Sequence, residues 1–182
     1  VYSLFHFFTI TEDFQIFTNE SFYHIISNMT NLVGLQKCPE YDFDKVYQSI
    51  KTLFSLVPPP DVKGKKVLLK PNILYPKKPE LAVCTHPVVV GAAVKAFTDL
   101  GATVYAGESP AIAGSTSAAK ATGMYDQVVN NGGQWIDFKD AEIVECPEGH
   151  AVKQLNFATA FKQADVVVSL SKLKSHQFMS YT

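Results

Sequence analysis

The sequence contains no arginine, and all sixteen of its basic residues are lysines. Arginine is the residue that grips phosphate and carboxylate groups through paired hydrogen bonds. Any anion that this chain binds must therefore be held by lysine, histidine or backbone N–H groups. The formal net charge is −1 at pH 7, so there is no overall basic field to attract nucleic acid or an anionic membrane surface. We expect neither as a partner.

Cysteine is scarce as well. Cys38, Cys84 and Cys146 are far apart, without the spacing of a zinc or iron–sulfur motif, and their odd number argues against a disulfide framework. We interpret them as reduced thiols of a cytoplasmic protein and expect no metal or cofactor in this chain. No apolar run approaches the roughly 18 residues that a membrane-spanning helix requires.

Several well-known nucleotide and hydrolase motifs are missing too. The segment Gly64-Lys65-Lys66 lacks the upstream glycine of a phosphate-binding P-loop. No Gly-x-Gly-x-x-Gly follows a predicted strand, and no Gly-x-Ser-x-Gly marks a hydrolase nucleophile. Dinucleotide binding of the usual kind is therefore not expected.

Residues 1–28 differ in composition from the rest of the chain. They contain no lysine, alanine, glycine or proline, but eight of the 22 aromatic residues. Two interpretations stay open: an appendage that packs on a partner, or an extension upstream of a natural start at Met29. We take the second as the working hypothesis, with residues 1–28 outside the fold and residues 29–182 forming the domain.

From residue 30 onward, helical and strand patterns alternate. Apolar residues spaced by three and four predict a helix over 42–57, with Asp42 as its N-cap. Val67-Leu68-Leu69 is continuously apolar, as in a parallel strand buried on both faces, and Pro71 is expected to end that strand. A second helix is predicted over 87–100, with Thr85 as its cap. A third is predicted over 115–131, capped by Ser115 or Thr116 and interrupted at Gly123, and a fourth over 157–163. The other predicted strands cover 32–36, 103–106, 135–138, 143–145 and 165–170.

This alternation predicts an α/β fold, with a mostly parallel open sheet and helices on both faces in a Rossmann-like, three-layer arrangement. Open parallel sheets bind ligands beyond the carboxyl ends of their strands. Polar clusters directly follow three of the predicted strands, so we expect all three to meet at one edge of the sheet. The clusters are Lys70-Pro71-Asn72, Gly107-Glu108-Ser109-Pro110 and the run from Ser171 to His176.

These clusters contain the candidate ligand-binding residues. Lys172, Lys174 and His176 would share one face of an extended segment, as a row of three donors suited to an anion. Each cluster also has a plainer interpretation, as a turn or as solvated lysines. Glu108 and His176 are the candidates for a catalytic role. The candidate ligand-binding residues are Lys70, Asn72, Thr85, His86, Glu108, Ser109, Lys172, Lys174 and His176.

The segment Cys84-Thr85-His86-Pro87 is a fourth candidate. A thiolate and an imidazole two residues apart can share a metal ion, but two ligands are too few, so we predict no metal site. His86 at the start of a helix could instead meet a ligand.

Four motifs, in order along the chain, resemble the family known as domain of unknown function 362. They are Lys65 to Asn72, Cys84 to Pro87, Gly107 to Pro110 and Asp165 to His176, and the resemblance spans residues 29–182. It implies a bacterial or archaeal protein with no agreed reaction. Many members carry a ferredoxin-like [4Fe–4S] segment, but the cysteine pattern of that segment is absent here, so no cluster is transferred to any residue. Cys84 and Ser171 depart from the family's usual threonine and proline.

The resemblance also implies a longer protein, of which this chain is the N-terminal part. We therefore predict a domain that binds a small anionic ligand at the carboxyl edge of its sheet, in a redox or iron–sulfur-associated setting. The alternatives are a non-catalytic scaffold for an iron–sulfur partner and an inactive fragment that lacks its C-terminal half. Whether the protein is an enzyme is left open.

Overall fold

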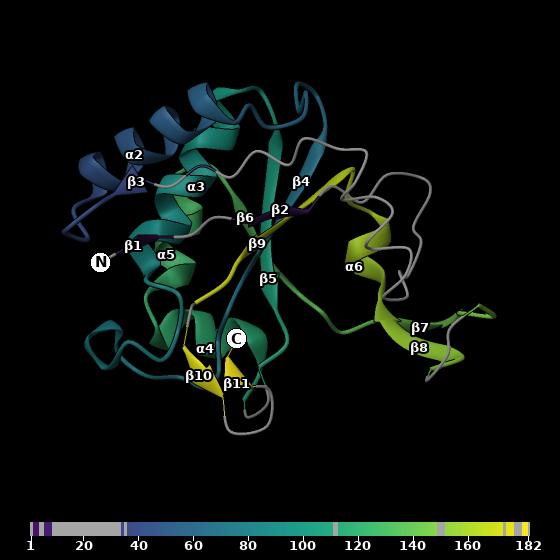
Figure 1. Cartoon of the computed structure of the whole chain (residues 1–182). Coiled ribbons are helices and arrows are strands. Elements are labelled where there is room, and N and C mark those ends of the chain that lie inside the picture. Colours follow the sequence, from purple (N-terminus) through teal and green to yellow (C-terminus); the bar gives the residue numbers. More distant parts are fainter. Residues whose placement is uncertain are drawn as a thin grey trace.

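The computed structural model describes residues 2–3, 6–8, 34, 36–110, 113–148, 152–172, 174–176 and 180–181, with the backbone alone for 2–3, 6–8, 175–176 and 180–181. Its main sheet has the strand order β2-β9-β4-β5-β6 (Figure 1). The four strands from β9 to β6 run parallel, and β2 pairs antiparallel with β9 at one edge. The strands are β2 (His6–Phe8), β4 (Lys66–Pro71), β5 (Thr103–Glu108), β6 (Gln134–Asp137) and β9 (Val166–Leu170).

The central strand of the sheet, β4, has a continuously apolar middle. Val67, Leu68 and Leu69 of β4 are each at most 1% exposed, as expected for a strand covered on both faces. Leu69 is the register partner of Ala106 on β5 and of Val168 on β9. Pro71 ends β4 as predicted and is itself the last residue of the strand, paired with Leu170. A strand's final position does not require the missing N–H.

Four helices cover one face of this sheet. In α3, Val90, Val94 and Phe97 are at most 1% exposed and belong to the core cluster. The predicted N-cap of α2 is confirmed, since the Asp42 carboxylate accepts from the Lys45 N–H at 3.0 Å. The helices are α2 (Phe43–Leu56), α3 (Pro87–Asp99), α4 (Ser115–Ala121) and α5 (Met124–Asn130).

The short helix α6 (Thr159–Lys162) lies on the opposite face. Between α6 and the sheet is a cavity of about 110 Å³, lined by Leu68, Tyr105 and Ile136 from the strands and by Ala160 and Gln163 from the α6 side. Leu68 alternates with the core-facing Val67 and Leu69 along β4, so it points to this other face. The predicted α/β fold, with a mostly parallel open sheet and helices on both faces, is confirmed.

The predicted helix over 115–131 is divided in two at Gly123, as the sequence suggested. Gly123 has a φ of +77° and separates α4 from α5. The predicted capping role of Ser115 or Thr116 is wrong. The N-cap position of α4 is Gly114, which has no side chain to offer.

One element departs clearly from the sequence interpretation. The strand β7 (Ala141–Glu145) pairs antiparallel with β8 (Gln154–Ala158), and Phe157 pairs with Glu142. The helix predicted over 157–163 therefore starts only at Thr159. Figure 1 shows this hairpin projecting away from the main sheet, beside α6.

Within residues 1–28 the structure describes two short strands. β1 (Tyr2–Ser3) pairs with β3 (Gln36–Lys37), and β2 pairs with β9. The remainder of this segment, including the proposed boundary at residue 28, lies outside the described residues, so its origin stays a prediction. Of the predicted strand over 32–36, only Gln36 is in a described strand.

In the part of the chain that the structure describes, no helix has the length and apolarity needed to cross a membrane.

Candidate functional site

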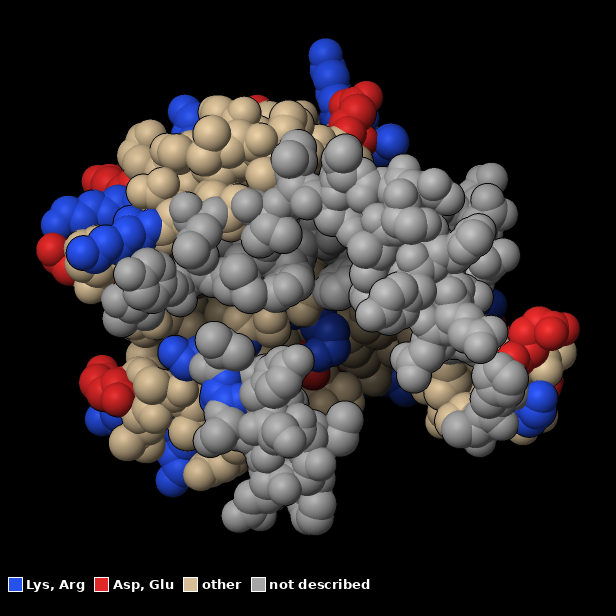
Figure 2. Space-filling view, viewed as in Figure 1, with Lys and Arg blue, Asp and Glu red and all other residues tan. Residues whose placement is uncertain are grey.

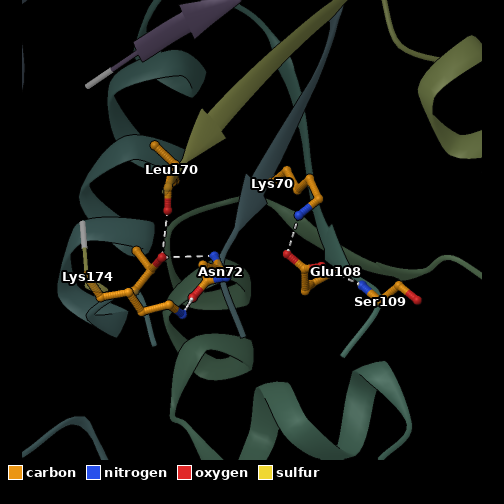
Figure 3. A network of polar contacts seen from close by, with 7 residues as sticks. Lys70, Asn72, Glu108, Ser109, Leu170 and Lys174 are labelled. Atoms are coloured by element: carbon orange, nitrogen blue, oxygen red, sulfur yellow. Dashed lines mark hydrogen bonds and ion pairs between the residues drawn. The ribbon is translucent and has the colours of Figure 1, made fainter. Parts of the chain in front are cut away.

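The carboxyl ends of β4, β5 and β9 bring the predicted polar clusters together. Lys70 is the register partner of Ser169, and Glu108 is the register partner of Asp137. Figure 3 shows two connected groups of polar contacts at this edge: one from Lys70 to Glu108 and Ser109, and one from Leu170 to Asn72 and Lys174. We call this region the carboxyl edge.

An ion pair joins β4 to β5. The Lys70 Nζ lies 2.6 Å from Oε2 of Glu108, whose side chain is only 8% exposed. The other carboxylate oxygen of Glu108 accepts from the Ser109 backbone N–H at 2.9 Å. Both oxygens of Glu108 are thus engaged, and Glu108 balances the charge of Lys70 at this end of the sheet.

Thr85 ties three segments of the carboxyl edge together. Its hydroxyl donates to the Leu170 carbonyl at 2.6 Å and accepts from the Asn72 N–H at 2.9 Å, while its own N–H donates to the Asn72 carbonyl at 2.9 Å. Thr85 is 4% exposed. The prediction that Thr85 caps α3 is wrong. The N-cap is His86, whose Nδ1 accepts from the Val88 N–H.

Lys174 reaches back from the end of β9 to the loop after β4. Its Nζ donates to Oδ1 of Asn72 at 2.5 Å and to the Val83 carbonyl at 3.3 Å. Both acceptors are uncharged. Burial lowers the pKa of Lys174, and the positive charge of Lys172 acts in the same direction.

His86 is held between an aromatic ring and a backbone donor. Its imidazole stacks on Tyr41, with the ring centroids 3.8 Å apart and 4° between the planes. Since Nδ1 accepts a hydrogen bond from Val88, the neutral ring carries its proton on Nε2. Burial lowers the pKa of His86, the charge of Lys172 lowers it further, and Glu80 of the 3₁₀ helix η1 (Pro79–Leu81) opposes the shift.

Lys172 is half-buried on the segment after β9, outside any described strand. It has no hydrogen-bond or ion-pair partner among the residues that the structure describes. Its charge acts on both His86 and Lys174, which places it at the carboxyl edge.

The remaining predicted residues are less informative. Ser109 is exposed, and its backbone supports Glu108. His176 lies in β10 (Ser175–His176), which pairs with β11 (Ser180–Tyr181). The side chain of His176 is outside the described part of the chain, so its predicted place in the row of donors is untested.

Sequence reasoning missed Asp137, at the end of β6. Its Oδ1 accepts from the Thr116 N–H at 3.0 Å and from the Thr116 hydroxyl at 2.7 Å, and Lys139 lies 3.2 Å from its Oδ2. The hydrogen bond from Thr116 is the main reason that the pKa of Asp137 is lowered. The predicted strand covered 135–138, so Asp137 fell inside it and was not selected by the rule that identified polar residues directly after strands; only the observed end of β6 at Asp137 brings it to this edge.

The three cysteines do not fit an iron–sulfur cluster. Each is buried, and each thiol lies against a carbonyl near its own segment: Cys38 against Glu40, Cys84 against Tyr75 and Cys146 against Val144. In the described residues, no group of three histidine, cysteine, aspartate or glutamate side chains is arranged to hold a metal ion.

The face seen in Figures 1 and 2 is hollowed near the lower centre, where β4 and β5 end. Lysine atoms lie in this recess, with acidic atoms beside them (Figure 2). The fold and this edge together define an α/β protein with a lysine-containing site at the carboxyl ends of its parallel strands.

Comparison with known proteins identifies the family to which this chain belongs. The chain belongs to the family described as Domain of unknown function (DUF362), whose model matches residues 67–182. It is also similar to the thylakoid-associated protein sll1697 of Synechocystis sp., with 27% identity over 161 residues, which cover 85% of this chain and 48% of the relative. The chain thus spans about half the length of this curated relative. No solved structure matches it.

Proposed function

We propose that the chain binds a small anion, a carboxylate or a phosphate, at the carboxyl edge. The observation that supports this most directly is the charge balance around Lys174. Lys70 has the Glu108 carboxylate as a partner, whereas Lys174 bonds only to uncharged oxygens, and Lys172 has no partner among the described residues. Two lysine charges of this edge are thus available to an anion.

Burial makes these charges effective. The side chain of Lys174 is half-buried, and Lys172 is partly buried beside it. Coulombic interactions strengthen as water is excluded from a site, so an anion would gain more here than at exposed lysines elsewhere. The neutral His86 ring could add an Nε2–H donor to the same anion.

The wider setting of this activity is also a proposal. Because each cysteine thiol is buried against a carbonyl of its own segment, a redox or iron–sulfur setting would require a cluster held by a partner or elsewhere in a longer protein. The role of this domain would then be to bind an anionic reactant, or to dock such a partner through its lysines.

Calorimetric titration of the chain with inorganic phosphate, and separately with glycolate, tests the anion site. Lys172→Ala should weaken binding about tenfold or more, since a hydrogen bond to a charged group contributes about 1.5–3 kcal/mol. Lys65→Ala is the matched control, because Lys65 is an exposed lysine at the opposite end of β4 and should not affect affinity.

Glu108→Gln is a second variant, for which the anion affinity should rise instead of fall. It removes the carboxylate that partners Lys70 and should tighten anion binding about threefold to tenfold, through the loss of a nearby negative charge. A variant that merely loosens the fold would not bind more tightly. Binding that is equal in the wild type, the Lys172→Ala variant and the Glu108→Gln variant would refute the anion site.

A further inference from the structure

We propose that Lys174 is a nucleophilic lysine, which forms an imine with the carbonyl group of a small oxo acid. The proposal rests on the anion site proposed above, since the adjacent lysine would hold the carboxylate of that oxo acid. The two uncharged acceptors of Lys174, and the lack of an ion pair to it among the described residues, carry the inference.

A lowered pKa lets Lys174 exchange between the ammonium form, which attracts an anion, and the neutral amine, whose hydrogen bonds fit the two acceptors present. A neutral lysine amine has two N–H donors and one lone pair. Two acceptors are present, Asn72 Oδ1 at 2.5 Å and the Val83 carbonyl at 3.3 Å. Both N–H groups are then used, and the lone pair stays free to attack. An ammonium group at the same place would have a third N–H without an acceptor among the described residues.

Lys70 provides the contrast on the same edge. Its Nζ is 2.6 Å from a buried carboxylate, with which it forms an ion pair. No carboxylate bonds to Lys174 in the described part of the chain. Burial has the largest effect on the pKa of Lys174 and lowers it. The charge of Lys172 acts in the same direction, whereas Cys84 and Glu108 oppose the shift. Desolvation and a neighbouring cation are the two conditions that make lysine amines nucleophilic.

The neighbouring groups favour an oxo acid as the reactant. Lys172 has no described partner and acts on Lys174 as a nearby positive charge, so it can hold a carboxylate while the carbonyl carbon of the same molecule meets the amine. An aldehyde or ketone without a carboxylate would lack this second contact.

The chemical step balances without any further reactant. The lone pair of the Lys174 nitrogen attacks the carbonyl carbon and forms a C–N bond. The nitrogen loses its two protons, the carbonyl oxygen leaves with them as water, and a C=N bond remains. No electron donor or acceptor is needed.

Reductive trapping tests the proposal on the unmodified chain. The protein is treated with glyoxylate and cyanoborohydride at neutral pH, and the labelled lysines are mapped by peptide mass spectrometry. Lys174 should be labelled at least about tenfold faster than Lys65 or Lys51, which are exposed lysines. Glycolate, which has a hydroxyl group in place of the aldehyde, should slow the labelling of Lys174 alone.

The outcomes separate this inference from the anion site. If glycolate binds and depends on Lys172, but Lys174 is labelled no faster than Lys65, the imine is refuted and the anion site stands. If neither glycolate binding nor selective labelling occurs, both proposals fail. Fast labelling of Lys174 that glycolate does not slow would refute an oxo acid as the reactant. Lys172→Ala should reduce the labelling rate about tenfold while leaving Lys65 unchanged.

Discussion

At the scale of single residues, Thr85 has the largest structural role at the carboxyl edge. We predict that Thr85→Val lowers the free energy of unfolding by about 1–3 kcal/mol, the usual cost of leaving buried polar groups unpaired. Valine keeps the shape of threonine but offers no hydroxyl to the Leu170 carbonyl or the Asn72 N–H. Urea denaturation measures the loss.

Thr85→Ser is the control for this prediction, because it retains the hydroxyl and removes only a methyl group. It should recover most of the lost free energy. Equal destabilisation by valine and serine would show that packing of the methyl group matters here, and that the hydrogen bonds do not.

The sequence predicted most of the residues that meet at this edge but not what holds them there. Parallel strands end on the same side of a sheet, so the sequence alone predicted that Lys70, Glu108 and Lys174 lie near one another. The hydrogen-bond partner of Thr85 could not be predicted in this way. Thr85 stands two residues before a proline and so resembles a helix cap, whereas its actual partner, Leu170, is 85 residues away. Rules based on neighbouring residues cannot decide whether the Thr85 hydroxyl bonds to a nearby helix N–H or to a carbonyl far away in the sequence.

His86 should make stability depend on pH. Its folded pKa is lowered from 6.5, by burial first and then by the charge of Lys172. The unfolded chain therefore binds the proton more readily, and stability is lost as the pH falls below 6.5 towards the folded pKa. Unfolding free energies of wild type and His86→Asn, compared across this range, check the prediction.

Asparagine is a good N-cap and does not titrate, so this variant keeps the start of α3 and removes the imidazole. The advantage of the wild type over His86→Asn should shrink as the pH falls. An advantage that is constant with pH would contradict a lowered pKa of His86.

At the scale of helices and strands, the break between α4 and α5 depends on the backbone of one glycine. Gly123 has a φ of +77°, a conformation that costs other residues about 1–2 kcal/mol. Gly123→Ala should destabilise the protein by that amount beyond the loss seen for Gly114→Ala, measured by thermal or urea unfolding.

Gly114 is a matched control because it is the N-cap residue of α4, as Gly123 is of α5, but has an ordinary φ of −68°. Both variants share the cost of an alanine N-cap, and only Gly123→Ala adds the left-handed backbone. Equal losses in the two variants would contradict the prediction.

Elements with a clear period or a continuous apolar core could be predicted, whereas the hairpin β7–β8 could not. The apolar stripe of α2 and the continuously apolar strands β4 and β9 follow from local pattern and burial. In β8, Phe157 precedes Ala160 and Phe161 at helical spacing, so the segment resembles the start of a helix. Its strand character comes from pairing with Glu142, which a local pattern does not contain.

At the scale of the whole molecule, the main sheet is packed against helices, whereas the hairpin sheet is largely uncovered. Helices α2 to α5 and the sheet enclose one core, whereas the hairpin β7–β8 forms a separate two-stranded sheet. Ile143 on β7 is 66% exposed. The base of the hairpin is attached to α6 through the ring of Phe161, which contacts Phe138 and Phe157.

This difference predicts a graded pattern of amide hydrogen exchange. Amides of Val67 to Leu69 should exchange only on global unfolding, which costs about 5–15 kcal/mol in typical domains. Those of β7 and β8 should exchange through local opening at a cost several kcal/mol lower, because an isolated two-stranded hairpin is marginally stable in water. Mass spectrometry of exchanged peptides measures both. Equal protection of the hairpin and β4 would contradict this prediction and would mean that another surface covers the hairpin in solution. Repeating the exchange at lower protein concentration would then show whether that surface is a second copy of the chain, since protection by a dimer falls on dilution.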